Sequence, residues 1–133
     1  MPALARQAVD SYRQTEVQSR TPLELVVMLY DGALRFIAQA RDAIERKDIR
    51  ARHQAITRTM AIVSELQSTL DMEKGGAVSE SLDSLYVYVN GCLLEAGTNR
   101  DVHPLDEAAK VLTALRDAWA EIAGSTATQR AAR

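Results

Sequence analysis

The segment from Thr21 to Gly32, TPLELVVMLYDG, constrains the fold more than any other part of the chain. Thr21 with Glu24 has the pattern of a capping box, and Pro22 stands at the first helical position, where its missing N–H is not needed. A long helix is therefore predicted to begin here. Its apolar side chains cover roughly 200° of its surface, more than one buried face requires. This surplus points to contact with a partner.

The composition favours a single helical domain. The chain has 133 residues, of which 47% are hydrophobic and only 5% aromatic, and it contains three prolines. A chain of this length builds one core, and Leu, Ile, Val and Ala pack well between helices. The net charge is −2, and no lysine or arginine block stands out against it. This balance argues against nucleic acid as a partner.

The sequence also bears on the cellular compartment. It has no N-terminal apolar stretch typical of a signal peptide, and no apolar run approaches the ~18 residues of a membrane span. Cys92 is the only cysteine, so an intramolecular disulfide is excluded. We therefore expect a soluble, cytoplasmic, all-α protein that does not insert into a membrane.

Four helical segments are predicted, at residues 22–46, 49–72 and 78–96 and from an N-cap at Asp101 to residue 122. Asp48 is predicted as the N-cap of the second segment, residues 73–76 with their glycine pair as a connection, and Gly97 as a helix end. The short connections favour an antiparallel up-down four-helix bundle over residues 21–123. Residues 1–20 are predicted to form a short amphipathic N-terminal arm, and residues 124–133 a disordered tail.

Each segment carries apolar side chains at helical spacing, which predicts the core. The second segment has the most regular stripe, with a seven-residue repeat. Tyr30 is predicted at the edge of the first stripe. The predicted core positions are Leu25, Val26, Leu29, Ala33, Phe36, Ile37, Ala40 and Ile44; Ile49, Ile56, Val63 and Leu70; Val78, Leu82, Leu85, Val89, Cys92, Leu93 and Ala96; and Leu105, Ala108, Ala109, Leu112, Leu115, Trp119 and Ile122.

The third segment has apolar residues outside its stripe. Val87 and Leu94 are seven residues apart, on the side opposite the predicted core, and they flank Gly91. An outward apolar pair beside a glycine is unusual for a helix with one dry face. The pair is therefore predicted to be exposed.

The residue types needed for catalysis or metal binding are not found at suitable spacing. His53 and His103 are the only histidines, on different predicted helices, and no Glu-x-x-His repeat of a di-iron bundle is present. His53 is better explained as an ordinary histidine at the edge of the second stripe than as a phosphotransfer residue. Cys92 is predicted as a core thiol, because it lies on the inward stripe and no basic residue stands at helical spacing from it. We expect no catalytic residue, no metal site and no cofactor.

Several short motifs occur in a fixed order along the chain. They are LYDG at 29–32, IVSELQ at 62–67 leading into LDMEKGG at 70–76, LDSLYVY at 82–88 and LRDAW at 115–119, with Tyr12 upstream. Together they resemble the FliS family, the flagellin export chaperones of flagellated bacteria. The resemblance covers roughly residues 8–122, most of the chain.

The resemblance implies a specific function. FliS-type proteins are small antiparallel helical bundles that bind the disordered C-terminal region of flagellin in the cytoplasm. They prevent its premature polymerisation and help to deliver it to the flagellar export apparatus. Further candidate partners are the export machinery itself and a second regulatory or co-chaperone protein. Flagellin wraps around the bundle, partly as helices in apolar grooves, and the N-terminal stretch of the chaperone can cover part of that surface.

On this basis, two sets of residues become candidates for binding. The predicted flagellin-binding groove contains Ile62, Leu66, Val87, Leu94 and Val111. The predicted N-terminal cap contains Leu4, Val9 and Tyr12, which would occupy a groove until flagellin displaces them. For Ile62 and Leu66, a place in an irregular core is an equally good interpretation, and Tyr12 could be a packing anchor.

A different class of function stays open beside this one. A self-associating structural bundle without a client would use the same surplus apolar strip as an oligomer interface. The two hypotheses differ in whether the strip stays available in solution.

Overall fold

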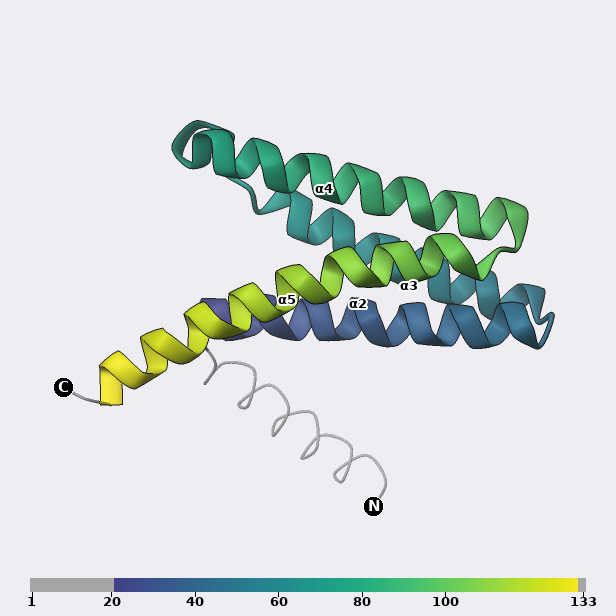
Figure 1. Cartoon of the computed structure of the whole chain (residues 1–133), viewed down its shortest axis with the longest axis horizontal. Coiled ribbons are helices and arrows are strands. Elements are labelled where there is room, and N and C mark those ends of the chain that lie inside the picture. Colours follow the sequence, from purple (N-terminus) through teal and green to yellow (C-terminus); the bar gives the residue numbers. More distant parts are fainter. Residues whose placement is uncertain (1–20, 132–133) are drawn as a thin grey trace, which may run out of the picture.

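The computed structural model describes the backbone of residues 21–131 and the side chains of residues 21–125. Four helices account for most of this part: α2 (Pro22–Glu45), α3 (Ile49–Ser68), α4 (Met72–Asn99) and α5 (Val102–Ala131). Consecutive helices run in opposite directions (Figure 1). Each packs against the next, and α5 returns to pack against α2. The predicted all-α, antiparallel up-down four-helix bundle is confirmed.

Side-chain caps begin the helices as predicted. The Thr21 hydroxyl accepts a hydrogen bond from the Glu24 N–H at 3.2 Å, and the Glu24 carboxylate accepts one from the Thr21 N–H at 3.2 Å. The Asp48 carboxylate accepts from the Ala51 N–H at 3.0 Å at the start of α3. Asp101 does the same for the first turn of α5. Each cap satisfies backbone donors that the helix itself leaves unpaired.

The boundary between α3 and α4 differs from the prediction. Helix α3 ends at Ser68 rather than at Met72, and α4 begins at Met72. The reason is Asp71, whose carboxylate accepts from the N–H groups of Glu73 and Lys74 and so starts a helix there. The predicted connection over residues 73–76 is therefore helical except at Gly76, where φ of 52° and ψ of −127° produce a kink.

The ends of α4 and α5 also lie later than predicted. Gly97 does not end α4, which continues to Asn99 and closes at Arg100 in the left-handed conformation with φ of 53°. Gly97 instead faces α3, because a Cβ at this position would lie 3.4 Å from Ile56 Cδ1. Helix α5 continues to Ala131, past residue 124, where the sequence predicts a tail.

The core follows most of the predicted stripes. Three predicted core residues are wrong, because Ile49, Val78 and Ile122 are all exposed. Ile49 is the first residue of α3 and Val78 follows the kink at Gly76. Ile122 precedes Ala123, which is buried and lines a depression with α2, so the Ile122 side chain lies off the contact face of α5. Near a helix end, a stripe can continue past the neighbouring helix that would cover it.

A buried tyrosine pair joins α2 to α4 at the centre of the bundle. Tyr30 and Tyr86 are almost fully buried, and their hydroxyls share a hydrogen bond at 2.5 Å. Burial raises the pKa of both hydroxyls above the ordinary tyrosine value, so both stay neutral. Tyr30, which widens the predicted apolar stripe of the first helix, is therefore part of the core. Cys92 is buried, as predicted.

Candidate functional site

Helix α4 presents an exposed apolar pair. Val87 is 57% exposed and Leu94 58% exposed, which confirms the prediction that both point outward. They lie about two helical turns apart on one face of α4. Gly91 stands between them, and a Cβ built there would meet no atom within 4 Å. The surface between the two side chains is therefore open.

Leu94 also borders a cavity between α3 and α4, which we call the α3–α4 groove. The cavity has a volume of about 230 Å³. Leu93 forms part of its floor and is fully buried in the core. The groove thus joins a well-packed floor to an exposed apolar edge. Its lining residues are Arg52, His53, Ile56, Thr57, Met60, Leu93, Leu94, Gly97 and Thr98.

The other predicted groove residues are not brought together with this pair. Leu66 is only 2% exposed and belongs to the core. Ile62 is half-buried, and its Cδ1 lies 3.3 Å from where a Cβ of Gly32 would stand, so it faces α2. Val111 is half-buried on α5 and packs against the core. Leu4, Val9 and Tyr12 of the predicted cap lie outside the described residues.

A second apolar depression lies between α2 and α5, and we call it the α2–α5 groove. It has a volume of about 350 Å³ and is lined by Glu24, Val27, Met28, Asp31, Arg116, Ala120, Ala123 and Gly124. Asp31 accepts a hydrogen bond from Arg116 Nε at 2.8 Å, which ties the two helices together at the edge of the groove. Sequence reasoning did not select Val27 or Met28, although the continuous apolar run at 25–29 was a usable signal.

No group of three or more His, Cys, Asp or Glu side chains that could hold a metal occurs within residues 21–125. His53 is exposed at the rim of the α3–α4 groove, whereas Cys92 is buried. None of the described helices is long and apolar enough to cross a membrane. What the arrangement offers is apolar surface between helices, which suits the binding of an amphipathic helix.

Comparisons with known proteins agree on one family. The family model described as flagellar protein FliS matches residues 5–126. The flagellar secretion chaperone FliS of Campylobacter jejuni is 38% identical over 115 residues, which cover 86% of this chain and 90% of the relative. The flagellar secretion chaperone FliSB of Pseudomonas aeruginosa is 34% identical, with 86% of this chain and 94% of the relative covered.

A solved structure shares the fold. The crystal structure of a flagellar chaperone from bacteria superposes with a TM-score of 0.73 at 17% identity. The match covers 91% of this chain and 98% of the other. At this identity it supports the four-helix architecture.

Proposed function

This chain belongs to the FliS family of flagellar secretion chaperones, a non-enzymatic family, and we propose that its client is the C-terminal region of flagellin. It binds this region in the cytoplasm, holds it in its apolar grooves and prevents premature polymerisation. It then assists delivery to the flagellar export apparatus. The export machinery and a second regulatory or co-chaperone protein are further partners in this proposal.

The observation that carries the proposal is the exposed pair Val87 and Leu94 beside the α3–α4 groove. A client helix laid along this face would cover both side chains and fill the groove with its own apolar residues. Ordering a disordered client costs entropy, which keeps the affinity moderate and allows release without ATP. The α2–α5 groove, with a volume of about 350 Å³, offers a second apolar surface for another client segment.

Binding is tested by co-purification of the chain with a peptide from the flagellin C-terminal region. The control is the same peptide with its apolar residues replaced by serine. We expect the native peptide to co-purify and the polar peptide to be lost, because the groove recognises apolar side chains. Equal recovery of both peptides, or recovery of neither, would contradict the proposal.

The rival hypothesis, a self-associating structural bundle, would also use Val87 and Leu94. Light scattering over a range of protein concentrations separates the two hypotheses. A chaperone without client is expected to keep a constant mass, because its apolar face stays available. A mass that rises with concentration, together with failure of the native peptide to bind, would favour the rival.

Deletion of residues 1–14 tests the N-terminal arm as an internal competitor. The arm carries Leu4, Val9 and Tyr12 and leads into Thr21, one turn before the α2–α5 groove begins at Glu24. If the arm covers a groove, its removal leaves the bundle folded and raises the affinity or association rate for the flagellin peptide. Circular dichroism and binding kinetics measure the two effects. Loss of the helical fold on truncation would instead show that the arm is part of the core.

A further inference from the structure

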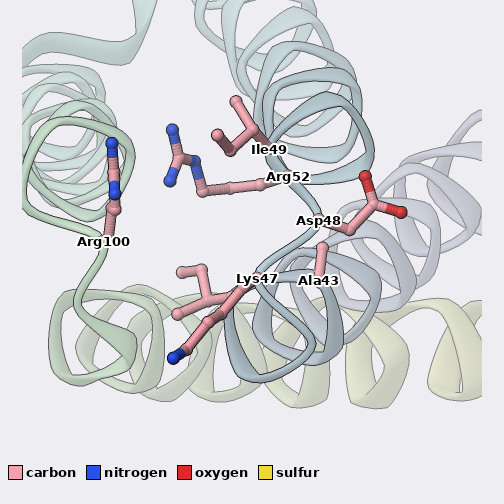
Figure 2. Close-up of a pocket in the computed structure, with 7 residues that line it drawn as sticks. Ala43, Lys47, Asp48, Ile49, Arg52 and Arg100 are labelled. Carbon is pink, nitrogen blue, oxygen red and sulfur yellow. The ribbon is translucent and has the colours of Figure 1, made fainter.

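A third cavity lies at one end of the bundle, where the α2–α3 connection meets the α4–α5 connection. It has a volume of about 330 Å³, and three basic side chains, Lys47, Arg52 and Arg100, line it together with Ile44 and Ile49. We call it the basic end pocket. In Figure 2 the guanidinium group of Arg52 extends across the opening toward the side chain of Arg100. Lys47 lines the pocket from the α2–α3 connection, and its ammonium group points away from the two guanidinium groups in this view.

None of these three cations has a counter-ion among the described residues. Three other arginines have one: Arg41 pairs with Asp106, Arg46 with Asp42, and Arg116 with Asp31. Asp48, the one acidic residue that lines the pocket, forms no ion pair with these three side chains. Its carboxylate points away from the other side chains in Figure 2, caps α3 at Ala51, and lies 3.7 Å from Arg46.

Three positive charges gathered without an anion repel one another, and an anion between them would replace repulsion by charge-assisted hydrogen bonds. Lys47 and Arg100 both have positive φ, 59° and 53°, in the left-handed region that favours glycine or asparagine. A basic side chain therefore stands at each of two positions where the backbone favours a different residue type.

The pocket is not purely ionic. Ile49 is 58% exposed there and Ile44 is half-buried, so the walls offer apolar surface next to the charges. A simple inorganic anion would leave this surface uncovered. A peptide segment with acidic side chains next to an apolar one would satisfy both kinds of wall.

The pocket adjoins the groove proposed for the client, because Arg52 lines both cavities. We propose that the client segment in the α3–α4 groove carries acidic side chains that bind Lys47, Arg52 and Arg100, and an apolar side chain that packs on Ile49. This inference rests on the proposed function. The basic end pocket gives the α3–α4 groove a charged end, which fixes the position of the client segment along the groove.

The test compares the double variant Arg52→Gln/Arg100→Gln with the unsubstituted chain in calorimetric titrations with the flagellin C-terminal peptide. Glutamine keeps a long polar side chain and removes the charge. We expect the affinity to fall roughly tenfold at about 0.05 M salt and the difference to shrink at about 0.5 M salt, because partly exposed ion pairs are screened. The charge-matched control is Arg35→Gln/Lys74→Gln, at two exposed positions that line none of the three cavities.

A second experiment removes the negative charges of the client peptide. Replacing the acidic residues of the peptide by their amides should weaken binding to the unsubstituted chain and have little further effect on the double variant. Equal affinity of the double variant and the unsubstituted chain would overturn the inference alone. An equal loss in the control variant would also overturn it, because net charge rather than the pocket would then be responsible. Failure of the unsubstituted chain to bind the native peptide would contradict the proposed function itself.

Discussion

Replacing Val87 and Leu94 together by serine is expected to weaken binding of the flagellin C-terminal peptide about 30-fold. Burying a whole Val or Leu side chain is worth about 1.5–3 kcal/mol. Both side chains are 57–58% exposed in the free bundle, so each gains about 1 kcal/mol when a client covers the rest. The sum of about 2 kcal/mol corresponds to about 30-fold in Kd. Isothermal titration of the two proteins with the same peptide measures the difference.

The same double variant should stay folded, since substitutions at exposed sites change the free energy of unfolding by about 0.5 kcal/mol or less each. A matched control is Met72→Ser/Val78→Ser, which removes two exposed apolar side chains near the start of α4 that line none of the grooves. The control should bind the peptide like the unsubstituted chain. An equal loss of affinity in both variants would mean that general surface hydrophobicity, rather than this face, holds the client.

The order of the helices and the way they start are readable from the sequence because they depend on local chemistry. Thr21 with Glu24, Asp48 and Asp101 each cap a helix with contacts that span at most three residues. The boundary at Asp71 uses the same chemistry, but the glycine pair that follows favours a connection. The cap outweighs Gly75, and only Gly76 leaves the helical conformation.

A residue of the candidate site can be predicted from the sequence only where the periodicity of its own helix determines whether it is exposed. Val87 and Leu94 project from α4 opposite its own stripe, so helical periodicity alone identifies them. Ile62 was not assignable in this way, because its position beside a stripe does not say which neighbouring helix it meets, and the structure turns it toward Gly32.

The basic end pocket depends on longer-range structure. Lys47 and Arg100 are far apart in the sequence and meet Arg52 only because two connections lie at the same end of the bundle. Their left-handed backbone conformations, at residues other than glycine, also have no clear sequence signal. No helical stripe predicts such a cluster.

Leu66 belongs to the core, although the sequence predicts it in the client groove. Leu66 follows Thr59 by seven residues, and Thr59 is fully buried although it is polar. Its hydroxyl donates to the Ala55 carbonyl at 2.8 Å, so its polar group is satisfied within α3 and the side chain can enter the core. Thr59 and Leu66 thus form a second inward column beside Ile56 and Val63. Because Thr59 is polar, a search for apolar residues at helical spacing does not detect this column.

Leu66→Ala is therefore expected to destabilise the bundle by about 2–5 kcal/mol, because it removes a fully buried side chain and leaves a cavity. Urea unfolding followed by circular dichroism measures this loss. The matched control is Leu94→Ala, the same substitution at an exposed position, which should change the free energy of unfolding by about 0.5 kcal/mol or less. The affinity for the flagellin peptide should show the reverse order of effects. Under conditions where both variants are folded, Leu94→Ala weakens the complex and Leu66→Ala leaves it nearly unchanged. If Leu66→Ala were as stable as the unsubstituted chain but no longer bound the peptide, Leu66 would belong to the binding surface. The α3 packing described above would then be wrong.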